Sequence, residues 1–189
     1  FHYLLLNLRN KKIRHERRIL LPKKITEAGL LTGLALLLSY IESLFPFQAG
    51  IPGFKLGLAN LVIVIALYFL KPGEVFLISL LRILGTGFFS GNLISFLFSF
   101  IGGLCSFIVM LLCFRSRLFS PAGLSIAGGT AHNLAQLAAA ALLLNLKSLL
   151  WYTPVLLFAG ITTGLGIGLI AGYLIPALQT YKNSDKQLM

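Results

Sequence analysis

The stretch LISFLFSFIGGLCSFIVMLLCF, residues 93–114, decides the fold class of this chain. It is 22 residues long and contains no Asp, Glu, Lys, Arg or His. An α-helix needs about 20 predominantly apolar residues to cross the hydrocarbon core of a bilayer. The stretch is therefore predicted to be a membrane-spanning helix, which makes the chain an integral membrane protein.

The composition of the whole chain favours the same class. Of the 189 residues, 57% are hydrophobic and only 11% are charged, and the mean hydropathy is +0.90. The charged and Pro/Gly-rich breaks divide the chain into six apolar segments. They run over approximately residues 25–44, 56–70, 75–89, 93–114, 124–146 and 149–175. The second and third segments are short, which allows them to be tilted, kinked or partly re-entrant.

The distribution of charge predicts the topology. There are 16 Lys and Arg residues against five acidic ones, and 13 of the basic residues fall on one side if the chain starts in the cytoplasm. Such a bias marks the cytoplasmic side of a membrane protein and needs no nucleic-acid partner. We therefore expect an all-α, multi-pass protein of the plasma membrane with six transmembrane helices and both termini cytoplasmic. Its parts are a basic N-terminal segment (1–24), a transmembrane domain (25–177) and a short tail (178–189).

Several kinds of chemistry are excluded by what the chain lacks. Asp185 is the only aspartate, so no Asp-rich magnesium site for diphosphates and no pair of catalytic carboxylates can be assembled from aspartates. Cys105 and Cys113 are separated by about 12 Å of helix rise, too far to pair. No GxxxxGK[ST] phosphate loop is present. We predict no catalytic residues, no metal and no cofactor, and hence a protein that is not an enzyme.

Arg82 is the most costly of the polar residues predicted to lie within the membrane, and no residue on its own segment neutralises it. One interpretation is an ion pair with Glu42 near the outer end of the first segment, reached by the long Arg side chain. The other is a role in a cavity, where Arg82 binds an anion or a carbonyl group. The two interpretations are compatible.

The fifth segment adds polar residues at a similar depth. Its sequence GGTAHNLAQL, residues 128–137, places His132 and Gln136 on one helix face with Asn133 beside them. Three neighbouring polar side chains favour a polar cavity over isolated packing contacts. The predicted pocket combines them with other polar residues near mid-depth or in the outer half of the membrane. Its members are Arg82, His132, Asn133, Gln136, Asn60, Glu42, Lys55 and Asn92. Residues 45–55, FPFQAGIPGFK, form either a lid over this pocket or a structured surface turn.

Small residues at four-residue spacing predict where helices pack closely in a bilayer. One such stripe lies on the last segment, at Gly160, Gly164, Gly168 and Gly172. A shorter one lies on the first segment, at Ala28, Gly29, Thr32 and Gly33. The stripes serve packing within this chain, or the first one docks a separate membrane subunit.

Three parts of the sequence together resemble a known family. The first part is the first segment with the loop that follows it, which includes IPGFKLGLAN (51–60). The second is the third segment, which includes ISLLR (78–82), and the third is GGTAHNLAQL (128–137) of the fifth segment. They are similar to the Gx transporter family, also labelled heptaprenyl diphosphate synthase component I, which resembles the S components of energy-coupling factor (ECF) transporters. The similarity extends over about residues 25–177.

The resemblance implies a six-helix subunit that captures a small vitamin-like compound, for example a flavin or a quinone precursor, near the outer face. Such subunits associate in the bilayer with a membrane coupling subunit and two cytoplasmic ATPases, and small residues on the first helix usually mediate docking. The alternative implied by the second label is a non-catalytic membrane partner of a heptaprenyl diphosphate synthase. The scarcity of aspartate argues against independent processing of diphosphates.

Overall fold

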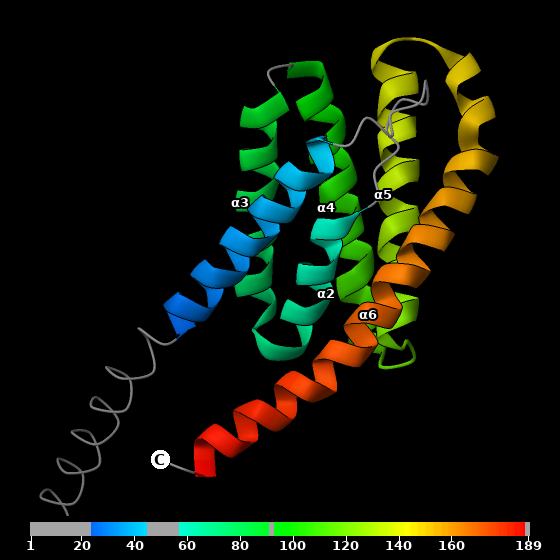
Figure 1. The fold of residues 1–189 in the computed structure, drawn as a ribbon. Helices are drawn as coiled ribbons and strands as arrows, with labels where there is room; N and C mark the ends of the chain where they lie inside the picture. Colours follow the sequence, from blue (N-terminus) through cyan, green and yellow to red (C-terminus); the bar gives the residue numbers. More distant parts are fainter. Residues whose placement is uncertain (1–23, 45–56, 91–92, 188–189) are drawn as a thin grey trace, which may run out of the picture.

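The computed structural model describes residues 24–44, 57–90 and 93–187, and these residues form helices joined by short connections, with no strand among them (Figure 1). An N-terminal helix, Lys24–Leu44, comes first. It is followed by α2 (Leu58–Phe69), α3 (Pro72–Ser90), α4 (Leu93–Ser116), α5 (Pro121–Leu143), the short 3-10 helix η1 (Lys147–Tyr152) and α6 (Thr153–Gln187). All six apolar segments predicted from the sequence thus form helices.

Three of the described helices are long and apolar enough to cross a membrane. They are Lys24–Leu44, Phe96–Ser116 within α4, and Lys147–Ser184, which joins η1 to α6. Helix α2 is too short, with 12 residues. Helices α3 and α5 have 19 and 23 residues and carry polar residues of the predicted pocket. The structure therefore supports a helical membrane protein.

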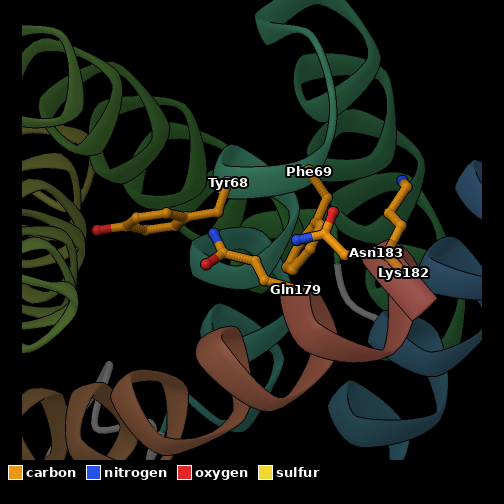
Figure 2. A pocket seen from close by; sticks show the side chains of 5 residues that line it. All are labelled: Tyr68, Phe69, Gln179, Lys182 and Asn183. Atoms are coloured by element: carbon orange, nitrogen blue, oxygen red, sulfur yellow. The ribbon is translucent and has the colours of Figure 1, made fainter. Parts of the chain in front are cut away.

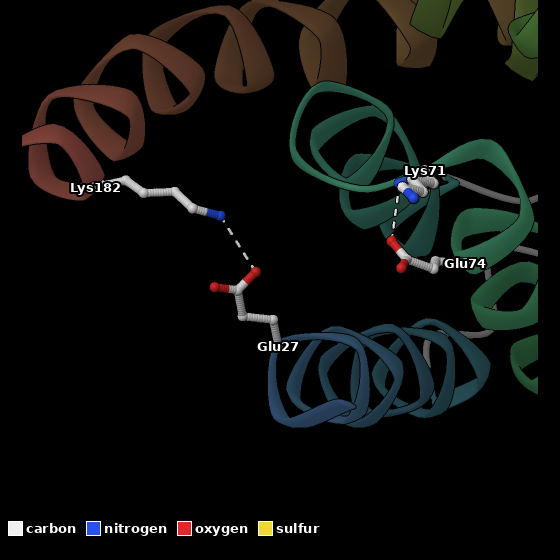
Figure 3. Close-up of polar contacts among 4 residues, drawn as sticks. All are labelled: Glu27, Lys71, Glu74 and Lys182. Carbon is white, nitrogen blue, oxygen red and sulfur yellow. Dashed lines mark hydrogen bonds and ion pairs between the residues drawn. The ribbon is translucent and has the colours of Figure 1, made fainter. Parts of the chain in front are cut away.

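Helices α3 and α6 begin at other residues than the sequence predicted, and α6 also ends later. Helix α3 begins at Pro72, three residues earlier than predicted, because the proline occupies the first turn and Glu74 caps it. The Glu74 carboxylate accepts the Lys71 backbone N–H at 2.9 Å (Figure 3). Helix α6 begins later than predicted because η1 intervenes, and it continues to Gln187, beyond the predicted start of the tail at residue 178.

From α2 to α6, consecutive α-helices contact one another and alternate in direction (Figure 1). Helix α5 packs between α4 and α6, while α3 packs on α4. The short α2 contacts α3, α4, α5 and α6, and it lies in the lower half of the bundle in Figure 1. Its apolar side chains form the centre of the core, with Ile63, Val64 and Ala66 fully buried against Ile78 of α3 and Met110 of α4.

One end of the bundle carries most of the described positive charge. The start of the N-terminal helix, the α2–α3 and α4–α5 connections and the end of α6 lie together at this end (Figure 1). The basic residues of these segments whose side chains are described are Lys24, Lys71, Arg115, Arg117 and Lys182. Lys147 belongs to η1 at the opposite end. The arrangement agrees with the charge distribution from which the topology was predicted, and we call this end the basic end.

Candidate functional site

Helix α2 begins inside the bundle and not at its edge. Its 12 residues extend about 18 Å, against about 30 Å for a bilayer core. The Gly57 cap has φ 76° and ψ 26°, a left-handed conformation that favours glycine. A Cβ there would lie 3.6 Å from Ile167 Cδ1, close to the middle of α6. The positive end of the α2 dipole is thus placed within the bundle.

Glu42 lies at this buried helix start. Its Oε1 accepts the Gly57 backbone N–H at 2.6 Å, so the carboxylate caps α2 from the N-terminal helix. A carboxylate is stabilised at a helix N-terminus because it satisfies a free N–H and faces the positive end of the dipole. Glu42 therefore has a structural role that the sequence did not predict, in addition to its predicted relation to Arg82.

Arg82 lies in the middle of α3 and is attracted electrostatically by Glu42. The ion pair between Arg82 and Glu42 stays a prediction. The guanidinium lies beside Gly103 of α4, where a Cβ would be 3.9 Å from Nη2 and 2.5 Å from Ile83 Cδ1. The Nε atom is buried and has no hydrogen-bond partner among the described residues. Arg82 thus keeps an unused donor in the interior of the bundle.

Gln136 approaches the other side of the same α4 turn. A Cβ at Gly102 would lie 2.5 Å from Gln136 Cγ and 3.0 Å from the His132 carbonyl oxygen. The Gln136 Nε2 donates to Ser99 Oγ at 3.3 Å, whereas the buried Oε1 has no partner among the described residues. The adjacent glycines of α4 therefore allow α3 and α5 to bring Arg82 and Gln136 against the same turn from two sides.

The other predicted pocket residues on described segments point elsewhere. Asn133 is 2% exposed, and its Nδ2 donates to the Leu156 carbonyl at 3.2 Å, so it links α5 to α6. Asn60 is 6% exposed and lies 3.1 Å from the Cβ position of Gly128, early in α5. Asn60 is thus closer to the basic end than the sequence predicted, because α2 covers only half of the bundle. His132 is half-buried, and its backbone carbonyl lies beside Gly102 of α4.

Two predicted pocket residues, Lys55 and Asn92, lie outside the described residues, as does the predicted lid at residues 45–55. The described residues also contain no group of three or more His, Cys, Asp and Glu side chains suited to a metal ion. Cys105 and Cys113 are both free.

Sequence reasoning missed the α4 face between Arg82 and Gln136. That face consists of small and polar residues at helical spacing: Ser99, Gly102, Gly103 and Ser106. Ser106 is 1% exposed, and its hydroxyl has no partner among the described residues. The S-x-x-G-G-x-x-S pattern of residues 99–106 could have predicted this face. The segment was interpreted only as a membrane-spanning helix, because its apolar length is its dominant feature.

The four predicted docking residues lie on two different faces of the N-terminal helix. Gly29 and Gly33 are exposed, and no heavy atom of the described chain lies within 4 Å of either Cβ position. Ala28 packs against the core, and Thr32 Oγ1 donates to the Ala28 carbonyl at 2.8 Å. Only the two glycines are therefore open to a partner.

The all-helical bundle, its membrane-length helices and its buried polar groups define a helical membrane protein. The model of the family described as heptaprenyl diphosphate synthase component I matches residues 31–174, well over half of the chain. The chain belongs to this family, which is also the Gx transporter family of the resemblance. No curated protein and no solved structure matches the chain.

Proposed function

We propose that the chain is the membrane-embedded substrate-binding subunit of an ECF-type importer. It would capture a small vitamin-like compound, such as a flavin or a quinone precursor, from outside the cell. In this proposal all six helices cross or enter the plasma membrane, and the basic end faces the cytoplasm. The partners are a membrane coupling subunit and two ATPases.

The observation that carries the proposal is the pair of unsatisfied polar atoms that meet the same α4 turn. Arg82 Nε and Gln136 Oε1 are both buried without a hydrogen-bond partner among the described residues. An unpaired polar group costs several kcal/mol in a hydrocarbon environment, so such groups mark binding sites in membrane proteins. One is a donor and the other an acceptor, a combination that suits a flavin, whose carbonyl groups accept and whose imide N–H donates. The carbonyl groups of a quinone would use the Arg82 donor alone.

The half-length helix α2 supports the same proposal. Broken or short helices that begin near the bilayer midplane are a feature of transporter binding sites, because their N-terminal ends attract anionic or carbonyl groups. Here the start of α2 is occupied by the Glu42 carboxylate, which is also attracted to Arg82. When no substrate is bound, the negative charge of Glu42 would balance the positive charge of Arg82.

The proposal is tested by ligand-dependent thermal unfolding of the purified chain. Riboflavin and menadione represent the two compound classes. A ligand present at 100 times its Kd stabilises the folded state by about 2.7 kcal/mol, which a melting curve resolves. Arg82→Ala is expected to abolish the shift. Arg82→Lys retains the charge and serves as the second variant if the alanine variant does not fold. A full ligand response in both variants would remove Arg82 from the site.

The family description favours a second candidate, a non-catalytic membrane partner of a heptaprenyl diphosphate synthase. The two functions predict different complexes. Recovery of a membrane coupling protein with ATPases on the tagged chain would support the importer. Recovery of a soluble prenyltransferase without these subunits would support the second candidate and contradict the first.

A further inference from the structure

A pocket at the basic end is lined by none of the predicted site residues. It has a volume of about 350 Å³ and is lined by Tyr68 and Phe69 at the end of α2 and by Gln179, Lys182 and Asn183 near the end of α6. Figure 2 shows the two amide side chains between the Tyr68 ring and the Lys182 chain. The lining thus combines one cation, two amides, a phenol and an apolar ring.

The cation of the pocket is held in place by two contacts. The Lys182 ammonium lies 3.2 Å from the Glu27 carboxylate of the N-terminal helix (Figure 3). It also lies 5.7 Å from the centroid of the Phe69 ring, within the range of a cation–π contact. An ammonium has three N–H donors, so the bond to Glu27 leaves donors for another oxygen ligand. The Lys182 side chain is 39% exposed and therefore accessible from the pocket.

The depth of the pocket follows from the exposed aromatic residues of η1 and α6. Trp151 is 86% exposed, Tyr152 39% and Tyr173 82%. Tyr152 and Tyr173 are 21 positions apart (173 − 152), which corresponds to about 31 Å of helix rise and matches the thickness of a bilayer core. Exposed Trp and Tyr residues concentrate at the two membrane interfaces. Lys182 follows Tyr173 by more than two turns and so lies at the level of the lipid headgroups.

We propose that this pocket binds the phosphate head of an amphiphile whose chain lies in the adjacent leaflet. Lys182 supplies the charge, and the Gln179 and Asn183 amides supply neutral donors for the remaining phosphate oxygens. Phe69 lines the pocket and provides an apolar surface for the first carbons of the chain. Leu178 and Tyr181, which are exposed and precede Gln179 and Lys182 in the sequence, extend this surface. The inference concerns a pocket at the basic end that Arg82 does not line, and it does not rest on the proposed importer function.

The test measures binding to the purified full-length chain in an uncharged detergent. The probes are dioctanoyl phosphatidylglycerol, farnesyl diphosphate, inorganic diphosphate and dioctanoylglycerol, which has the same chains as the first probe but no phosphate. We expect at least one phosphate-headed amphiphile to raise the melting temperature, and the stronger of the two identifies the source of the headgroup. Dioctanoylglycerol and inorganic diphosphate are expected to have little effect.

The decisive variant is Lys182→Gln, which should weaken binding of the amphiphile about ten-fold through loss of one charge-assisted hydrogen bond. Arg115→Gln is the matched control, because it removes a positive charge from the same end of the bundle outside the pocket and should bind normally. The double variant Gln179→Ala with Asn183→Ala replaces Lys182→Gln if the latter does not fold. Wild-type affinity in the pocket variants, an equal response to inorganic diphosphate, or no response to either amphiphile would overturn the inference.

Discussion

Two stripes of small residues share a four-residue spacing in this chain but have opposite surroundings. On α6, Gly160, Gly164 and Gly168 lie directly against the backbone of α5. A Cβ at Gly160 would be 2.9 Å from Thr130 Cα, and one at Gly164 would be 2.7 Å from Ile126 Cα. On the N-terminal helix, Gly29 and Gly33 have no described atom within 4 Å of their Cβ positions.

The difference shows that spacing alone does not determine what a small-residue stripe contacts. Helix α5 offers its own small residues opposite those of α6, for example Gly129 opposite Gly160, so the two backbones can approach closely. The N-terminal helix uses another face for contact within the chain, where Leu36 fills the space beside Gly85 of α3. No described residue covers its glycine face.

The largest expected effect is the loss of close packing between α5 and α6. In Gly160→Val the new side chain would overlap the Thr130 backbone, which cannot move as a side chain can. We expect the free energy of unfolding in detergent to fall by about 1–3 kcal/mol. Gly166→Val is the matched control, because Gly166 lies on the same helix with no described atom near its Cβ position. Equal melting temperatures of the two variants would contradict the packing argument.

The α5–α6 pairing also shows how far the fold could be predicted from the sequence. The stripe at Gly160, Gly164 and Gly168 was predicted to pack, and the contacts confirm this for these three glycines. Gly172 was predicted with them, but no described atom lies within 4 Å of its Cβ position. The difference arises because the stripe on α6 continues beyond the start of α5 at Pro121, so no α5 backbone remains opposite Gly172.

A smaller effect is expected from the polar link across the same interface. Asn133→Leu removes the hydrogen bond from Nδ2 to the Leu156 carbonyl. Hydrogen bonds between helices in membranes contribute about 0.6 kcal/mol on average and about 1.7 kcal/mol at most. We expect a loss of stability in this range, measured by chemical unfolding. Thr162→Val, whose hydroxyl bonds only within α6, should change stability less. A larger loss in Thr162→Val would show that Asn133 does not link the helices.

The candidate site could be predicted only in part from the sequence. Individual residues show why some positions were predicted and others were not. The cost of burying Arg82 identified the residue, because charge in an apolar segment is a strong signal, and its Nε is indeed buried. Asn133 was grouped with His132 and Gln136, since sequence spacing does not show which side of α5 faces α6. Asn60 was placed too far from the basic end, because the half-length of α2 depends on tertiary contacts at Gly57.

The smallest effect on stability is expected at the open stripe. Gly33→Leu adds a side chain where no described atom lies within 4 Å, so the melting temperature of the isolated chain should be unchanged or slightly higher. If this face docks the coupling subunit, the same substitution should abolish its recovery on the tagged chain, because close helix contact requires small residues. Gly166→Leu makes the same change at an equally open position on α6 and should leave recovery intact. Normal recovery with Gly33→Leu would assign docking to another face, whereas a large loss of stability would show that the two stripes have the same role after all.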